Sequence, residues 1–253
     1  MNRLEKYKSI GVKPADAAAD IALINKFAMK ELAPDEVFCF SVVLCDNDID
    51  RDLERFTDNT LEKLANLFVG KTGISDHKWS ADHQIARLYR VEVEATKEKN
   101  RLGQPLKRLR GSAYMMKNEA NQPVIEAIEG GIMKEVSIGC AVSKAVCSVC
   151  GNEYGTCGHY KGEVYDGRQC FVNLEDPVDA YEFSFVAVPA QPAAGVTKGV
   201  QDPRTAFEVL ANIDLTKYVG DVKKLMPRFQ SALLNEAERA ERAAIAKAAE
   251  QYR

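Results

Sequence analysis

The sequence predicts an α+β protein with a mostly antiparallel sheet at its core and helices at its periphery. Residues 37–46 are rich in β-branched and aromatic side chains, which is typical of a buried strand. Residues 85–96 and 106–116 predict the two strands of a hairpin, because side chains in the first alternate between two faces. Residues 179–196 form another β-prone run, interrupted near its end by two prolines. These runs supply the core.

Three segments have the periodicity of short helices. Apolar residues recur at helical spacing over residues 15–31, and this helix is expected to end before Pro34. Residues 60–68 return to the same spacing. Residues 118–129 predict a helix that is terminated by two glycines, which readily adopt the left-handed conformation of a helix end.

A serine lies on one face of the strand that follows these glycines. Within residues 133–142, Val136 and Ile138 share one face and Ser137 and Gly139 share the other, since side chains alternate along a strand. We therefore expect Ser137 to lie beside a glycine.

The chain divides into a sheet domain with two helical flanks. We expect an N-terminal helical extension at residues 1–33, the sheet domain at residues 34–200 and a charged helical tail at residues 201–253. The tail is rich in Ala, Glu, Arg and Lys and has too few large apolar residues for a core helix. Within the sheet domain, residues 145–172 form a cysteine-rich insertion.

The composition argues against several classes of protein. With 46% hydrophobic and 28% charged residues, the chain has the composition of a soluble globular protein. Its N-terminus lacks the apolar segment of a signal peptide, so we expect a cytoplasmic protein. No apolar run approaches the roughly 18 residues that span a bilayer. A formal net charge of -3 argues against a protein whose main task is binding nucleic acid.

Three sequence markers follow one another in a specific order. The first is His77 in ISDHKWS, followed eight residues later by IAR; the second is GGIMKEVSIG, which contains Ser137; the third is YEFSFVAVPAQPAAGV. Together they resemble the caudovirus prohead protease family, itself similar to the herpesvirus assembly proteases, over residues 37–200. The resemblance implies a β-barrel-like sheet and an endopeptidase that trims scaffold or capsid-protein segments in an assembling procapsid.

The same resemblance implies where the protein works and with what. Its substrates and partners would be the major capsid protein and the scaffold protein of a bacteriophage, inside the procapsid in the bacterial cytoplasm. The herpesvirus relatives are dimers, so a homo-oligomer is expected by analogy. Neither a membrane nor a specific nucleic acid is expected as a partner.

By this resemblance Ser137 is the nucleophile and His77 is its general base. A serine hydroxyl must lose its proton to attack a peptide carbonyl, and imidazole side chains in general titrate near neutral pH and can accept it. The family places its catalytic histidine about eight residues before the IAR-like segment, where His77 lies and His83 does not.

The resemblance leaves open the third catalytic member, which orients the histidine ring. Glu182 is the choice, because strand alternation places it on the face of Ser184, opposite the aromatic residues Tyr181, Phe183 and Phe185. The alternatives are Asp176, Asp179 and His159. His159 belongs among them because the herpesvirus relatives use a second histidine downstream of the serine.

Four of the seven cysteines lie in the insertion, and in a reducing compartment such clustering favours metal ligation over disulfides. The expected ligands of a structural zinc ion are Cys147, Cys150, Cys157 and His159. Cys170 could replace His159 as the fourth ligand. Four protein ligands leave no open position, so no cofactor is expected for catalysis.

Two other functions fit parts of the sequence. The sheet domain could display the cysteine-rich insertion to a partner, as a zinc-stabilised interaction module without proteolysis. Alternatively, the charged tail could make the chain an assembly scaffold, a role that can coexist with proteolysis.

Overall fold

The computed structural model describes residues 17–197, so the charged tail expected at residues 201–253 lies outside the described part of the chain. Its elements are α1 (Ala17–Ile24), β1 (Val37–Asp46), β2 (Glu54–Phe56), α2 (Asp58–Phe68), β3 (Thr72–Ser75), β4 (Ala86–Lys99), β5 (Pro105–Met116), α3 (Gln122–Glu129), β6 (Val136–Cys147), β7 (Val164–Tyr165), β8 (Arg168–Gln169), β9 (Val172–Phe185) and β10 (Gly195–Thr197). Two short 3-10 turns complete them, η2 (Pro34–Glu36) and η3 (Ala81–His83).

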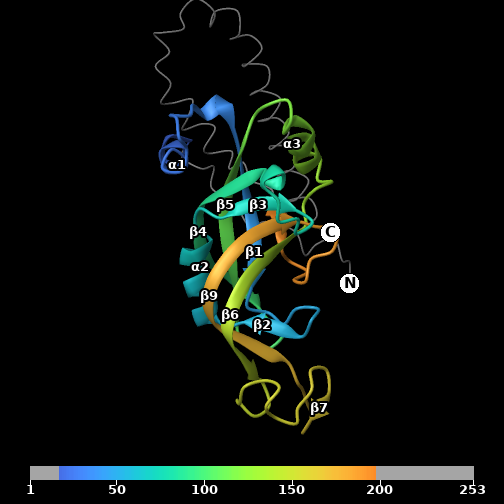
Figure 1. The fold of residues 1–253 in the computed structure, drawn as a ribbon. Helices are drawn as coiled ribbons and strands as arrows, with labels where there is room; N and C mark the ends of the chain where they lie inside the picture. The colour runs from blue at the N-terminus through green and yellow to red at the C-terminus, as the bar shows by residue number, and fades with distance from the viewer. Residues whose placement is uncertain (1–16, 198–253) are drawn as a thin grey trace, which may run out of the picture. The chain divides into compact units, whose positions relative to one another are not determined.

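The core is one eight-stranded mixed sheet, which confirms the α+β prediction (Figure 1). The strand order is β10-β1-β5-β4-β3-β9-β2, and β6 pairs with β9 outside this path. The pairs of β9 with β2 and β3 are parallel, whereas its pair with β6 and the remaining pairs of this sheet are antiparallel. Parallel pairing is possible because long stretches of chain separate β2 and β3 from β9, so neither pair is joined by a tight turn.

The sheet does not close into the barrel that the resemblance implied. The path ends in two three-residue strands, β10 and β2, and β6 branches off at β9. Among the described residues, an isolated bridge between Glu135 and Gly195 joins the start of β6 to β10. The ends of the sheet therefore meet without forming a continuous ladder.

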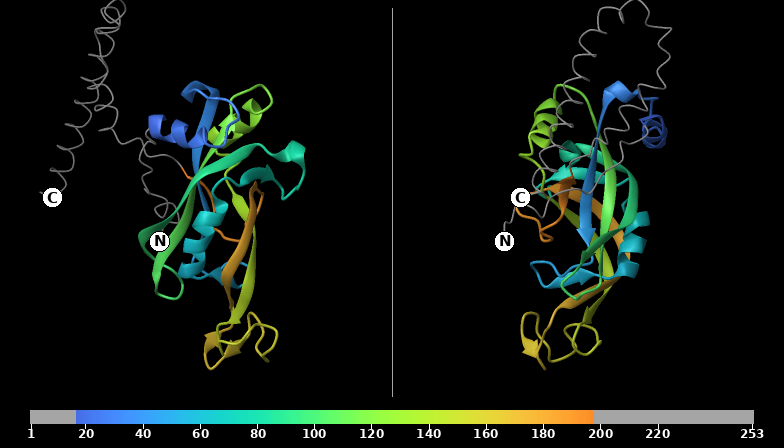
Figure 2. Two further views of the ribbon diagram at one scale, coloured as in Figure 1. Left: turned by 60° about the vertical axis from the view of Figure 1, so that its left-hand side comes forward. Right: turned by 180° about the vertical axis from the view of Figure 1, so that it is seen from behind.

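Helix α2 covers one side of the core. Thr57 caps its first turn by accepting a hydrogen bond from the backbone N–H of Thr60. Leu61, Leu64 and Phe68 recur at helical spacing and are completely buried against the sheet. The helix contacts β9, β4 and β5 and so packs against the middle of the sheet (Figure 2).

The first helix is shorter than the sequence predicted. α1 ends at Ile24 because Asn25 pairs with the backbone of Leu32, its side chain donating to the carbonyl and accepting from the N–H. The chain thus turns back, and Ile24 and Leu32 pack against Tyr89 of β4. The third helix likewise begins at Gln122 rather than at residue 118, since residues 118–121 form a hydrogen-bonded turn.

A long antiparallel ribbon of β6 and β9 extends from the core. Its register runs from Val136 opposite Phe185 to Cys147 opposite Val172. The cysteine-rich insertion is the connection between these strands, residues 148–171, a few residues shorter than the predicted 145–172. Figures 1 and 2 show the insertion at the end of the ribbon away from α3. Among the described helices, none is long and apolar enough to cross a membrane.

Candidate catalytic and metal sites

The turn after β3 carries His77 back over β9. β3 runs parallel to β9 with Ser75 opposite Phe185, and the next two residues, Asp76 and His77, have left-handed φ values of 53° and 52°. The backbone N–H of Asp76 donates to the Phe185 carbonyl at 3.0 Å. The N–H of His77 donates to Ser184 Oγ at 3.1 Å. These two hydrogen bonds place the imidazole above β9.

The ring of His77 is held by a buried carboxylate. His77 Nδ1 lies 2.9 Å from Glu182 Oε1, and the side chains are 42% and 4% exposed, respectively. Glu182 Oε2 accepts a hydrogen bond of 2.6 Å from Ser184 Oγ. Because an ionised carboxylate only accepts, we assign the neutral ring its proton on Nδ1, which leaves Nε2 as the free acceptor.

Gly139 makes room for this carboxylate. It lies directly opposite Glu182 in the β6–β9 register, and a Cβ at this position would lie 2.5 Å from Glu182 Oε1. Such a contact is far below van der Waals distance, so a side chain here would push Glu182 away from His77. The absence of a Cβ is therefore a requirement of the pair.

Ser137 lies on the same face of the ribbon. It is directly opposite Ser184, and cross-strand partners share a face. Because Ser184 and Glu182 lie on the same face of β9, Ser137 lies on the face of Glu182, two residues along β6 from Gly139. Ser137 is half-buried. Within the described residues its hydroxyl makes no hydrogen bond to His77, and such contacts commonly form only once substrate is bound.

The structure thus brings Ser137, His77 and Glu182 to one patch, while the other candidates for the third member are engaged elsewhere. Hydrogen bonds from Lys144 and Lys63 lower the pKa of Asp176 to about 2. Asp179 pairs with Lys71 at 3.2 Å. His159 belongs to the cysteine cluster. His83, set aside at the level of sequence, is exposed in the turn η3.

Two supporting residues had a weaker signal in the sequence. Ser184 is completely buried and joins Glu182 to the His77 backbone, and Gly139 accommodates the carboxylate. Strand alternation had already put both of them on the face of the site. Their roles depend on pairings between residues more than 40 positions apart, which alternation does not encode.

Tyr181 is not buried like Phe183 and Phe185, the two residues with which strand alternation grouped it. Phe183 and Phe185 are buried as expected, but Tyr181 is 39% exposed. The register shifts between Gly139–Glu182 and Cys140–Ala180, so Tyr181 is an extra residue in a β-bulge. The bulge interrupts the alternation on which the prediction relied.

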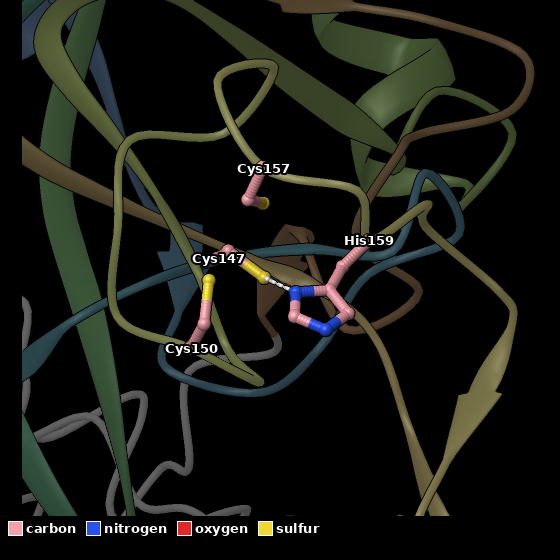
Figure 3. A group of neighbouring side chains, drawn as sticks. All are labelled: Cys147, Cys150, Cys157 and His159. Carbon is pink, nitrogen blue, oxygen red and sulfur yellow. Dashed lines mark hydrogen bonds between the residues drawn. The ribbon is translucent and has the colours of Figure 1, made fainter.

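Three cysteines and a histidine form a second cluster, in the insertion (Figure 3). The ligand atoms of Cys147, Cys150, Cys157 and His159 all lie within 4.8 Å of one another, with Cys147 Sγ 3.7 Å from His159 Nδ1. Cys147 is the last residue of β6, and the others follow in the connection to β9. These four residues could bind a metal ion.

The local backbone favours a thiolate at Cys147. The Gly151 N–H donates to the Cys147 carbonyl at 2.9 Å, and Gly151 has φ 76°, so the chain turns tightly around the sulfur. Burial alone raises the pKa of the Cys147 thiol, but hydrogen bonds from the backbone of Cys150 and Val149 and from neighbouring thiols lower it to about 6. Thiolate is the form that binds metals.

Cys170 lies on the other side of Cys147. Its side chain is completely buried, and its Sγ lies 3.9 Å from Cys147 Sγ. Burial, as the largest cause, raises the pKa of the Cys170 thiol. The mutually close set of four contains His159 rather than Cys170.

Fold and sites define an α+β protein with a Ser, His and Glu patch at one end of a β-ribbon and a Cys/His cluster at the other. No family model matches the chain, and neither a curated protein nor a solved structure matches it. The functional argument therefore depends on the residues themselves.

Proposed function

We propose that this protein is a serine endopeptidase in which Ser137 is the nucleophile, His77 the general base and Glu182 the residue that orients the ring. The observation that carries the proposal is the 2.9 Å contact of His77 Nδ1 with the buried Glu182 carboxylate, on the face of the ribbon that carries Ser137. Nucleophile, base and orienting acid on one patch are the three elements of a serine hydrolase triad.

The chemistry follows from the assigned protonation states. Ser137 Oγ transfers its proton to His77 Nε2 as it forms a bond to the substrate carbonyl carbon. The resulting imidazolium is stabilised by Glu182, whose charge lies beside Nδ1. His77 then gives the proton to the leaving amine as the peptide bond breaks. The acyl group is left as an ester on Ser137 Oγ. A water molecule gives a proton to His77 as it attacks this ester, and His77 returns the proton to Ser137 Oγ as the ester bond breaks and the carboxylic acid product leaves.

The substrate class comes from the sequence resemblance to the caudovirus prohead proteases. Segments of the scaffold protein and the major capsid protein, cleaved in the procapsid of a bacteriophage, are the expected substrates. Self-association of the protease during assembly is part of the same proposal.

The cysteine cluster is proposed to hold a structural zinc ion. Zn–S bonds of about 2.3 Å in a tetrahedron put ligand atoms about 3.8 Å apart. The 3.7 Å between Cys147 Sγ and His159 Nδ1 matches this spacing, and the whole set, within 4.8 Å, would contract slightly around the ion. Bound there, zinc would supply a crosslink rather than a reactive water, because four protein ligands fill its coordination.

A zinc-stabilised interaction or scaffold protein without proteolysis is the second candidate. The observation that favours it is the exposure of two apolar side chains on the insertion, Tyr160 at 67% and Val164 at 63%. Large apolar side chains left exposed on a small insertion are available to a partner.

Co-expression with the cognate capsid and scaffold proteins, read by intact mass, tests the proposal. Wild-type protein should produce shortened products, and Glu182→Gln should slow their formation by about 10²- to 10⁴-fold, because an amide keeps the shape of the carboxylate but cannot balance the imidazolium. Glu175→Gln, on the same strand, is the matched control and should cleave as wild type does. If wild-type protein gives assembled particles but no shortened products, the protease proposal fails and the interaction or scaffold function takes its place.

A further inference from the structure

Two aromatic side chains beside the catalytic patch are exposed and in contact with each other. Trp79, the only tryptophan of the chain, is 70% exposed, and Tyr181 is 39% exposed. Their ring centroids lie 5.3 Å apart with the planes tilted by 56°. Large aromatic surfaces are normally buried, and those left exposed in contact with one another are typical of binding sites.

The pair is built on the elements that carry the catalytic residues. After β3 the chain doubles back along β9 in successive contacts, from Asp76 with Phe185 to His77 with Ser184 and Glu182. Trp79, two residues after His77, makes the next contact in this series, with Tyr181. The aromatic pair therefore continues the line of contacts that positions the histidine.

The β-bulge explains why Tyr181 is available at this position. Ala180 and Phe183 both belong to the buried core, although strict alternation would put them on opposite faces. The extra residue lets both point inwards, while Tyr181 is left exposed and Glu182 reaches His77. Bulges commonly re-aim a side chain next to an active site in this way.

The spacing along the ribbon relates the pair to the scissile bond. Ser137 is level with Ser184, and Tyr181 lies three residues further along β9. Because Tyr181 is the extra residue of the bulge, the matching span on β6 runs from Ser137 to between Gly139 and Cys140. At about 3.3 Å per residue this is about 7 to 10 Å, which an extended peptide covers with two or three residues. Between the two positions β6 carries Gly139, where the Glu182 carboxylate occupies the space of a side chain.

The charges around the pair indicate which side chain it would accept. Asp76 and Lys78 pair with each other at 3.5 Å, and Lys71 and Asp179 pair at 3.2 Å. These charges are paired with one another, and the two rings themselves offer aromatic faces to a ligand. Such a surface gains most from burying a large apolar side chain.

We propose that Trp79 and Tyr181 form a substrate subsite that binds a large apolar side chain two or three residues from the scissile bond. The inference rests on the proposed endopeptidase activity and adds its substrate preference. The probe is a set of fluorogenic peptides. Each places either Phe or Ala at one of the three positions on either side of the cleaved bond.

Wild-type protein should cleave peptides with Phe at this position about tenfold or more faster in kcat/KM than those with Ala, as hydrophobic pockets generally discriminate. Trp79→Ala should remove most of this preference, and Tyr181→Phe, which keeps the ring, should retain it. Tyr160→Ala is the matched control, because Tyr160 is equally exposed at 67% but lies in the insertion.

The outcomes separate the two proposals. Loss of the preference in Trp79→Ala but not in Tyr160→Ala supports the subsite. Cleavage by Trp79→Ala with the preference unchanged overturns the subsite and leaves the endopeptidase standing. If wild-type protein yields products in co-expression but cleaves none of the peptides, the subsite is overturned as well. If it cleaves nothing in either assay, the protease itself is overturned.

Discussion

Replacing Ser137 with alanine is expected to lower kcat for peptide cleavage by at least about 10³-fold, and His77→Ala by a similar factor. Without the hydroxyl no acyl-enzyme forms, and without the imidazole the hydroxyl keeps its proton. Because the two groups act in one step, the double variant should be no slower than either single variant. Initial rates on a peptide that spans the cleaved junction measure all three.

A serine of the same strand supplies the control for this prediction. Ser143 is exposed on β6 and donates to the Asp176 carbonyl at 3.0 Å, outside the catalytic patch. Ser143→Ala should therefore keep wild-type rates. Multiplicative losses in the double variant, or wild-type rates in Ser137→Ala, would show that these side chains do not share one catalytic step.

Removing the proposed zinc ion is expected to unfold the insertion while leaving the sheet folded. Residues 148–171 contain two strands of two residues each, β7 and β8, and expose Tyr160 and Val164, so little buried apolar surface holds them together. Structural zinc contributes on the order of 10 kcal/mol in small zinc modules, which exceeds what such a segment supplies by packing. The sheet has its own core around Leu64, Leu88 and Phe183.

Hydrogen exchange with and without a chelator measures this effect. Amides that are hydrogen-bonded in the insertion, such as those of Gly151 and Cys170, should exchange at least about 10³-fold faster without metal, whereas amides of β4 and β5 should not change. Cys147→Ser should lose zinc by elemental analysis and behave like the chelated protein. Cys39→Ser, which alters an exposed cysteine outside the cluster, is the control. Unchanged protection after zinc is removed would contradict a structural role.

The strands that the sequence predicted best are those with uninterrupted apolar patterns. Residues 37–46 coincide with β1 because seven of its ten residues are buried, including the last five, so the apolar run marks the whole strand. β9 begins at Val172, earlier than predicted. The prediction missed its first half because Glu175, Asp176 and Asp179 weaken the apolar pattern of a strand there. Asp176 is accommodated by two lysines, Lys63 from α2 and Lys144 from β6, and such pairs between distant residues leave no local signal.

The sequence predicted the members of the Ser137, His77 and Glu182 patch but not the contacts between them. Ser137 and His77 came from the resemblance, and Glu182 from a carboxylate on the face of a strand. Which carboxylate meets His77 depends on the parallel register of β3 with β9 and on the left-handed turn at Asp76 and His77. Neither is visible in side-chain alternation, and the bulge at Tyr181 breaks that alternation.

The metal cluster was more accessible to sequence reasoning. Cys147 and Cys150 lie close in the chain, and so do Cys157 and His159, so a short loop suffices to bring the four together. The burial of Cys170 beside Cys147 was not predictable, because it depends on how β9 begins after the insertion.

Labelling with a serine-reactive fluorophosphonate, located by peptide mass spectrometry, tests the central claim most directly, because it needs no knowledge of the substrate. A base-activated serine attacks the phosphorus, whereas ordinary serines do not. We expect an adduct on Ser137 in wild-type protein and in Ser143→Ala, and none in folded His77→Ala. An adduct that forms equally without His77, or folded wild-type protein that is not labelled at Ser137, would contradict the assignment of this protein as a serine endopeptidase.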